Sequence, residues 1–388
     1  MSTADIVKRC QELYDDLSFT YARNWKNAVP GRKVVGFMPV YVPRELIHAG
    51  GMLPLGIFGG GDELEVIHGD AYYQSYICRI PRSTIELGVT NRLDFVDGML
   101  FPFVCDVIRN LSGIWKLMFP NVYTKFFDTP QNFKSDIGGK YYVHELKELK
   151  EGFEKLVGRP ITDDDMRNSI RLYNENRQVV REVYKLRAEK PWKVPAWEAY
   201  LLMRAGMIMD VEEHTQMMRD YMAAALSEDR PVRDNTRIVI TGSFCEQPPL
   251  NLVKSIEMAG CYVVDDDYHL VNRWLTADVP TDGDPFVALS ETFCKHSVET
   301  ACKYVPEEKD KGQFIVEQVR KTGAEGVIFA APSFCDPALL DRPMLQHRLA
   351  ENNIPFIAFK YAENSGQMQP IREQAGTFAD SIKLWSEA

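Results

Sequence analysis

Strand-like and helix-like stretches alternate at both ends of the chain, with a purely helical stretch between them, and this pattern predicts an α/β protein. We expect two Rossmann- or flavodoxin-like parallel-sheet domains plus a helical segment. The predicted boundaries are residues 1–145 for an N-terminal α/β domain, 146–232 for the helical segment, and 233–388 for a C-terminal α/β domain. At 388 residues the chain is long enough for two or three domains.

In the N-terminal part, the apolar stretches 33–38, 52–58 and 95–101 read as strands. A short helix over 44–49 separates the first two, and Gly50-Gly51 closes it, because glycine readily adopts the backbone conformation found just after a helix end. A further helix begins near Ser83. Strands separated by helices in this way indicate a parallel sheet covered on both faces.

The middle part is rich in Glu, Lys, Arg, Leu and Met, with apolar residues at helical spacing. Thr162 followed by the acids at 163–165 predicts a helix start, since a hydroxyl caps the first backbone N–H groups and negative charge suits that helix end. Pro191 and Pro195 interrupt the helical pattern.

In the C-terminal part, 237–242, 261–264, 326–330 and 354–359 read as strands, and 250–259 as a helix. Asp265, Asp266 and Asp267 follow the second of these strands and stand close to His269. We interpret them as a solvated turn rather than a metal site, because sites for hard cations need oxygen ligands that converge in space rather than merely adjoin in sequence.

Composition excludes several classes of function. Hydrophobic residues make up 45% and charged residues 26%, as in globular proteins, and the net charge is -10. That charge argues against a nucleic-acid partner, which requires clustered Lys and Arg. We also expect no membrane segment, because no apolar run approaches the roughly 18 to 20 residues that span a bilayer. The N-terminus lacks the apolar core of a signal peptide, so we expect a cytoplasmic protein.

The positions of the eight cysteines are more informative than their number. Cys105, Cys245 and Cys335 each follow a predicted strand, and ligands of open parallel sheets bind beyond the carboxyl ends of strands. Cys78 precedes a predicted helix, whose positive N-terminal end stabilises a thiolate. Cys105, Cys245 and Cys335, which come from two separate domains, could converge on a cleft between the two sheet domains.

An inert role is the alternative, because free cysteine is among the most buried residue types. Cys10, Cys261, Cys294 and Cys302 fit that interpretation from their helical or strand surroundings. The sequence contains no C-x-x-C pair, so the ferredoxin and zinc-ribbon patterns are absent. Spacing alone therefore leaves both metal ligands and buried thiols open.

Several separate motifs, in order along nearly the whole chain, resemble the 2-hydroxyacyl-CoA dehydratase and benzoyl-CoA reductase subunit family. The motifs are 39–54 (PVYVPRELIHAGGMLP), Cys78-Arg79 with Arg82-Ser83, 93–98 (LDFVDG), 105–109 (CDVIR), 241–243 (TGS) and 334–337 (FCDP). The compact length and the stretch 243–246 (SFCE) resemble the smaller cluster subunit of the ATP-dependent reductases more than a dehydratase subunit.

The resemblance implies that Cys78, Cys105 and Cys335 hold one [4Fe-4S] cluster, with one iron left without a protein cysteine. It also implies a homologous cluster subunit as partner, a separate ATP-hydrolysing iron-sulfur activator, ferredoxin as electron source, and an aromatic acyl-CoA substrate. The reductases convert benzoyl-CoA to a cyclic dienoyl-CoA, and the dehydratases remove a hydroxyl group. Cys245 is not clearly part of the implied ligand set, and its role stays open between substrate contact and an ordinary thiol.

The sequence also indicates that ATP, if it is used, binds to another chain. Gly59-Gly60-Gly61 is glycine-rich, but no Gly-Lys-Ser/Thr follows, so we interpret it as a turn rather than a phosphate loop.

Among other candidates, Arg79, Arg82 and Arg109 flank predicted ligands and could contact anionic substrate groups, although structural ion pairing is the commoner role. We interpret His48 as a packing or capping residue, and Glu257 as ordinary surface charge. Three functions compete: a benzoyl-CoA reductase cluster subunit, a 2-hydroxyacyl-CoA dehydratase subunit, and a non-catalytic electron-transfer protein of the same fold.

Overall fold

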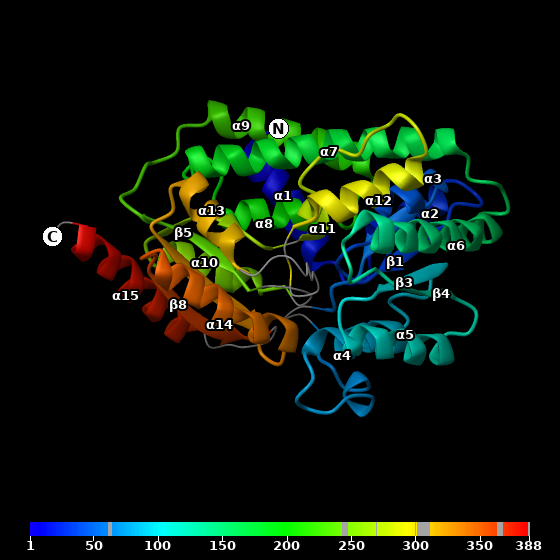
Figure 1. Ribbon diagram of the computed structural model, residues 1–388, viewed down its shortest axis with the longest axis horizontal. Coiled ribbons are helices and arrows are strands. Elements are labelled where there is room, and N and C mark those ends of the chain that lie inside the picture. Colours follow the sequence, from blue (N-terminus) through cyan, green and yellow to red (C-terminus); the bar gives the residue numbers. More distant parts are fainter. Residues whose placement is uncertain are drawn as a thin grey trace.

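The computed structural model describes residues 1–60, 64–242, 247–268, 270–298, 300, 311–362 and 368–386. Two four-stranded parallel sheets lie at opposite ends of the molecule, and long helices run across both (Figure 1). The predicted fold class, two parallel-sheet units with added helices, is confirmed. Among the described residues, no helix combines the length and the apolar composition that a membrane span requires.

The first sheet has the strand order β2-β1-β3-β4. Its strands, with the helices that precede or separate them in the sequence, are α1 (Thr3–Asp15), α2 (Thr20–Ala28), β1 (Val34–Phe37), α3 (Arg44–Ala49), β2 (Leu53–Gly56), α4 (Arg79–Val89), β3 (Gly98–Pro102), α5 (Asp106–Met118) and β4 (Tyr123–Phe127). Every residue of β1, β2 and β3 is buried. Because helices cover both faces, these strands are continuous apolar runs, which is why the sequence reveals them.

The second sheet has the strand order β6-β5-β7-β8, which repeats the order of the first. Its strands, with the helices that separate or follow them in the sequence, are β5 (Thr236–Thr241), α10 (Leu250–Met258), β6 (Cys261–Asp266), α11 (Leu270–Arg273), α12 (Pro285–His296), α13 (Gln313–Thr322), β7 (Gly326–Pro332), α14 (Asp336–Glu351), β8 (Phe356–Tyr361) and α15 (Met368–Ser386). In each sheet, the second strand in sequence lies on one side of the first strand and the third lies on the other side. The strand order therefore reverses between β1 and β3 in the first sheet and between β5 and β7 in the second.

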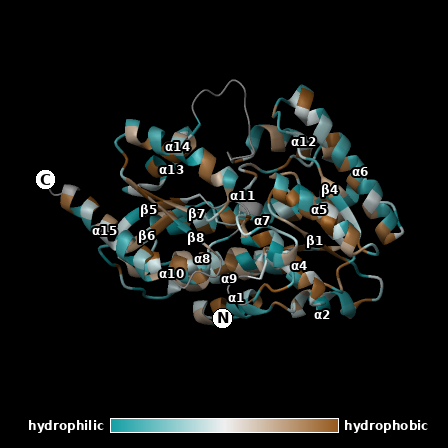
Figure 2. Cartoon of the chain, turned by 90° about the horizontal axis from the view of Figure 1, so that it is seen from below, coloured by the Kyte–Doolittle hydropathy of each residue, from teal (hydrophilic) through white to brown (hydrophobic). Residues whose placement is uncertain are grey.

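Hydrophobic residues concentrate along the strands of both sheets, and the outer faces of the helices are largely hydrophilic (Figure 2). Three clusters of buried residues make up the described core. The first surrounds the N-terminal sheet, and the other two cover the two faces of the C-terminal sheet. This layered packing holds the carboxyl ends of both sets of strands in fixed positions.

Between the strands of the two sheets, the sequence forms α6 (Lys140–Val157), α7 (Asp163–Glu189), α8 (Ala196–Ala205) and α9 (Val211–Ser227). Thr162 caps α7 as its sequence predicts: its side chain accepts from the N–H of Asp165, whose carboxylate accepts from the N–H of Thr162. The 27 residues of α7 pack against α3 at one end and against β6 at the other. This helix therefore ties the two sheet units together.

Two buried ion pairs reinforce that tie. Arg177 of α7 contacts Glu45 of α3, with Nη1 and Oε1 2.5 Å apart. Arg187, nearer the end of α7 that meets the second sheet, contacts Asp266 of β6, with Nη1 and Oδ2 2.6 Å apart. Both pairs are almost completely buried, so each charge depends on its partner for compensation.

The interpretation of Asp265, Asp266 and Asp267 as a solvated turn is wrong. Asp265 and Asp266 belong to β6, and Asp266 is 3% exposed. Their counter-charges are Arg187 of α7 and Arg273 of α11, and the carboxylate of Asp267 accepts from the N–H of Gly242. The sequence shows three adjacent acids, whereas the cations that make their burial possible come from other elements.

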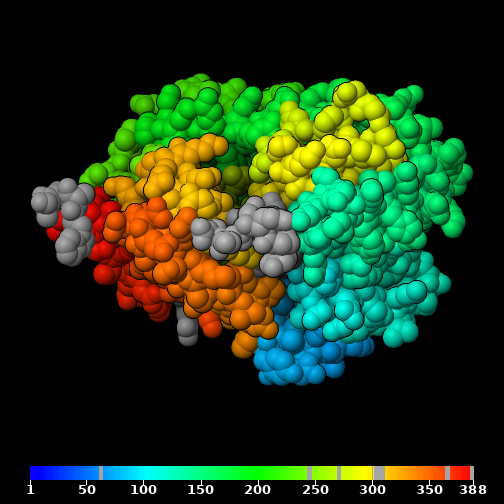
Figure 3. Space-filling model, viewed as in Figure 1, coloured from blue at the N-terminus to red at the C-terminus, as the bar shows by residue number. Residues whose placement is uncertain are grey.

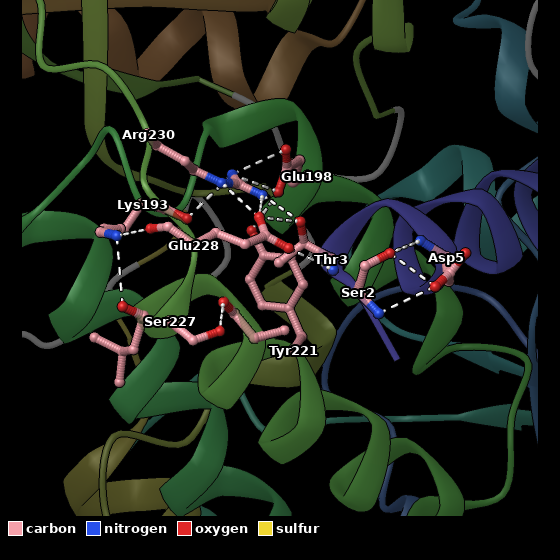
Figure 4. A network of polar contacts seen from close by, with 11 residues as sticks. Ser2, Thr3, Asp5, Lys193, Glu198, Tyr221, Ser227, Glu228 and Arg230 are labelled. Atoms are coloured by element: carbon pink, nitrogen blue, oxygen red, sulfur yellow. Dashed lines mark hydrogen bonds and ion pairs between the residues drawn. The ribbon is translucent and has the colours of Figure 1, made fainter.

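One segment from each half of the chain packs against the unit formed mainly by the other half. Although α1 comes first in sequence, Ile6, Val7 and Cys10 belong to the core that covers one face of the second sheet. A polar network anchors the start of α1 (Figure 4): Glu228 accepts from the N–H and the hydroxyl of Thr3, and Arg230 joins Glu228, Thr3 and Glu198. Since Glu228 accepts backbone N–H at the helix start, it adds a second cap there beside Ser2.

In the other direction, α12 comes from the C-terminal part of the sequence but packs on α6. Phe293 stacks on Tyr142 and Phe133, with ring centroids 4.3 Å and 4.9 Å apart. The first core cluster thus includes residues from both ends of the chain.

Candidate functional site

The repeated strand order places two of the predicted ligands at equivalent positions. Cys105 follows β3 and Cys335 follows β7, and each of these strands lies on one side of the point where its sheet reverses order. The crevice beyond the carboxyl ends of strands at such a point is where open α/β sheets bind ligands. Cys105 and Cys335 are therefore topological counterparts in the two halves of the chain.

Each of the three predicted ligands stands immediately before a helix. Cys78 is the N-cap of α4, Cys105 that of α5, and Cys335 that of α14. Exposed backbone N–H groups and the helix dipole make such positions favourable for thiolates and for other negative charge. At Cys105 burial raises the thiol pKa above its usual value, while the N–H groups of Ile108 and Val107 oppose that shift.

All three cysteines contact the core cluster that surrounds the N-terminal sheet. Cys335 is 6% exposed and belongs to the core cluster of the N-terminal sheet, and Cys78 and Cys105 pack against the same cluster. The charge of Asp336, the first residue of α14, acts on the thiol of Cys105. Figure 3 shows the orange surface of α14 meeting the blue and cyan surface of the N-terminal part. Cys335, a residue of the C-terminal half, is thus buried in a core built mainly by the N-terminal half.

The donor type of the three predicted ligands, cysteine sulfur, would suit an iron-sulfur cluster. In the described part of the chain, the groups of three side chains whose ligand atoms lie within 4.8 Å of one another are His48–Asp210–Glu212 and His144–Glu145–Glu148, and neither contains a cysteine. Thiolates that bind different irons of a cluster lie farther apart than the ligands of one ion. Thiolate donors are the ligands that iron-sulfur clusters require.

A tyrosine hydroxyl provides a further test of whether the residues near the cysteines suit an iron-sulfur cluster. The Oη atom of Tyr73 is buried without a hydrogen-bond partner among the described residues, and Tyr73 packs against the same cluster as Cys78 and Cys105. An acceptor in the space beside these thiols would satisfy it, and the sulfur atoms of a cluster are such acceptors.

A cavity of about 570 Å³ adjoins this region. Thr241 and Asp266, at the carboxyl ends of β5 and β6, form one wall, and α7, α13 and α14 supply others. Ala338 and Val298 line the cavity and also pack against the core cluster that contains Cys335. Figure 3 shows the surface hollowed between α13 and the yellow segment around α12. A small-molecule ligand in this cavity would contact Ala338, three residues after Cys335 on α14.

The three arginines that flank the predicted ligands have structural partners. Arg82 contacts Asp70 at 3.0 Å, and Arg109 contacts Asp106 at 3.8 Å in an exposed pair. Arg79 donates to the carbonyl oxygen of Leu64. The contacts of Arg82 and Arg109 are structural ion pairs, and those of Arg79 and Arg82 tie the start of α4 to the segment before it.

His48 packs as its sequence position indicates. Its ring meets Tyr173 edge-on, and Nδ1 lies 3.0 Å from the hydroxyl of Ser169. The interpretation of Glu257 as ordinary surface charge is wrong, because its carboxylate accepts from the N–H groups of Ala196 and Trp197 at the start of α8. Burial raises the pKa of Glu257 to about 7, against the opposing effect of these two N–H groups.

The remaining cysteines divide into two sets. Cys10, Cys261 and Cys294 are buried in the cores, and burial raises the thiol pKa of Cys10 and of Cys261 to about 12, which makes them inert. Cys245, Cys302 and His269 lie outside the described residues. Tyr73 has no motif that marks it in the sequence beyond a tyrosine-rich stretch shortly before Cys78.

Comparison with known proteins adds an independent line of evidence. The family model described as 2-hydroxyglutaryl-CoA dehydratase, D-component, matches residues 39–382. The chain is 68% identical over 386 residues to a benzoyl-CoA reductase subunit of Thauera aromatica, with all of both chains covered. It is 30% identical to the (R)-phenyllactyl-CoA dehydratase beta subunit of Clostridium sporogenes, over 92% of each chain. It is 28% identical to the (R)-2-hydroxyglutaryl-CoA dehydratase beta subunit of Acidaminococcus fermentans, over 92% and 94%.

Proposed function

Since the chain belongs to the 2-hydroxyglutaryl-CoA dehydratase D-component family, we propose that it is the iron-sulfur subunit of an ATP-dependent benzoyl-CoA reductase. Membership makes it a subunit of a reductase- or dehydratase-type enzyme complex, and its relatives are subunits of hetero-oligomers. The observation that carries the choice of reductase is the 68% identity over the full chain, against 30% or less for the dehydratase subunits.

We assign the three N-cap cysteines, Cys78, Cys105 and Cys335, as the protein ligands of one [4Fe-4S] cluster. Their positions beside three helix starts and against one buried core support this assignment. When bound, the cluster supplies single low-potential electrons to an acyl-CoA thioester. The helix N-termini offset its negative charge, and the surrounding core restricts the access of water.

The proposed partners follow from the sequence and from the relatives. A homologous cluster subunit completes the catalytic pair, and a separate iron-sulfur activator hydrolyses ATP, because this sequence contains no phosphate loop. Ferredoxin is the proposed electron source, and the product from benzoyl-CoA is a cyclohexadienoyl-CoA. The cytoplasm is the proposed location, where thiol ligands are kept reduced.

A dehydratase is the second candidate, since three relatives named as dehydratase beta subunits cover 92% of the chain. The two reactions give different products. The assembled complex, supplied with activator, reductant and ATP, should convert benzoyl-CoA to a dienoyl-CoA and leave a 2-hydroxyacyl-CoA unchanged. Loss of the hydroxyl from the 2-hydroxyacyl-CoA, with benzoyl-CoA untouched, would instead establish the dehydratase.

The cluster assignment is tested by iron and acid-labile sulfide analysis of protein purified without air. We expect Cys78→Ala, Cys105→Ala and Cys335→Ala each to lose the cluster, because two thiolates anchor it too weakly. The matched controls are Cys10→Ala and Cys261→Ala, which remove thiols buried away from the site and should keep full iron. Full iron in Cys335→Ala would show that the C-terminal half supplies no ligand.

A further inference from the structure

Tyr73 is a half-buried residue whose hydroxyl oxygen is fully buried and has an unmet hydrogen bond among the described residues. It lies in the segment before α4, and its hydroxyl oxygen is shielded from solvent without a hydrogen-bond partner among the described residues. Leaving a buried polar group unsatisfied is unfavourable. Phenylalanine at this position would avoid that penalty with the same ring, so the hydroxyl calls for an acceptor that the described polypeptide does not supply.

The surroundings of the hydroxyl indicate where that acceptor lies. Tyr73 packs against the first core cluster together with Cys78 and Cys105. Burial raises the pKa of Tyr73 above its usual value, and the neighbouring thiols of Cys78 and Cys105 raise it further. Two of the three proposed ligands are therefore close enough to act on this hydroxyl, and the described part of the chain offers it no other acceptor.

We propose that the Tyr73 hydroxyl donates a hydrogen bond to the edge of the cluster held by Cys78 and Cys105, and thereby raises its reduction potential. This inference rests on the proposed function, because it requires the cluster to be present. The acceptor is a cysteine Sγ or an inorganic sulfide. Hydrogen bonds to these sulfurs stabilise the more negative, reduced state, so that a donor makes the cluster easier to reduce.

Tyr73 is thus a positioning and tuning residue rather than a cluster ligand. Its ring packs against the first core cluster, and its hydroxyl offers a single donor. The neighbouring residues Tyr72 and Tyr76 are 45% and 63% exposed, so their hydroxyls have water as a partner. Of these three tyrosines in the segment before Cys78, Tyr73 is the one whose hydroxyl is enclosed.

The experiment is a redox titration followed by electron paramagnetic resonance on the Tyr73→Phe variant of the assembled complex, after iron analysis. We expect full iron content, a more negative midpoint potential than wild type, and altered g-values of the reduced cluster. The matched control is Tyr76→Phe, which removes an exposed hydroxyl from the same segment and should leave both readouts unchanged. Tyr73→Met, which keeps an apolar side chain without a hydroxyl, should shift the potential in the same direction.

The outcomes separate this inference from the assignment of the cluster. Wild-type protein without iron would overturn both. Full iron in Tyr73→Phe with the wild-type potential and spectrum would overturn the hydrogen bond and leave the cluster assignment standing. Loss of iron from both Tyr73 variants, with an unchanged near-ultraviolet circular dichroism spectrum, would also overturn it, since the hydroxyl would then be needed to assemble the cluster rather than to tune it.

Discussion

The ion pair between Arg187 and Asp266 offers a direct test of how α7 is joined to the second sheet. The Nη1 and Oδ2 atoms are 2.6 Å apart, and the side chains are 1% and 2% exposed. Arg187→Met keeps most of the apolar stem but removes the charge, which leaves the Asp266 carboxylate buried without its main cation. Removing one partner of a buried pair costs about 3 to 5 kcal/mol.

The contacts that remain place the expected cost at the lower end of that range. Asp266 Oδ1 still accepts from the Tyr184 hydroxyl at 3.0 Å and from the N–H of Tyr268 at 2.9 Å. The guanidinium contact is a charge interaction rather than an aligned hydrogen bond, because none of its three nitrogens has hydrogen-bond geometry to an acceptor in the described part. We therefore expect Arg187→Met to lower the free energy of unfolding by about 3 kcal/mol.

Urea unfolding followed by far-ultraviolet circular dichroism measures this change. The control is Lys185→Met, on the same helix but 75% exposed, which should change stability by less than about 0.5 kcal/mol. Adding Asp266→Asn to Arg187→Met should recover at least half of the loss, because the double variant buries no uncompensated charge. A single variant within about 1 kcal/mol of wild type, or a double variant no more stable than the single one, would refute this reasoning.

Three further outcomes are expected. Burial lowers the pKa of His214 to about 4, below its usual value near 6.5. His214 therefore contributes stability that is present above about pH 6.5 and is lost as the pH falls towards 4. In that pH range, the free energy of unfolding of His214→Gln should change less steeply with pH than that of the wild type. Cys10→Ala should lower the free energy of unfolding by about 1 kcal/mol in urea titrations while keeping full iron, since its thiol lies in the core against Met217. The isolated chain should release no phosphate from ATP, and measurable hydrolysis by homogeneous protein would contradict the assignment of ATP to another chain.

Much of the fold could be predicted because the central strands are buried on both faces. The apolar runs that form β1, β3, β5 and β7 are visible without any knowledge of their neighbours. The strand β4 was missed, because it lies at the edge of its sheet and mixes Thr124 and Lys125 with aromatic residues. The start of α4 was placed near Ser83, although the helix begins at Arg79 directly after Cys78. The proposed domain boundaries stay a prediction.

The candidate site could likewise be predicted only in part from the sequence. Its motifs and the positions of Cys105 and Cys335 after strands are properties of the sequence, and they suffice to identify the family. The side chains that act on those positions come from other elements: Asp336 near Cys105, and Tyr73 beside two thiols.

The sequence by itself thus determined the fold class, the family and the three candidate ligands, because buried strands and cysteine motifs are local patterns. Only the tertiary structure decided that Cys335 packs into the core of the other half, that Asp266 is buried against Arg187, and that the hydroxyl of Tyr73 is enclosed. Burial and charge compensation depend on residues far apart in the chain, and the packing of helices on two sheets brings those residues together.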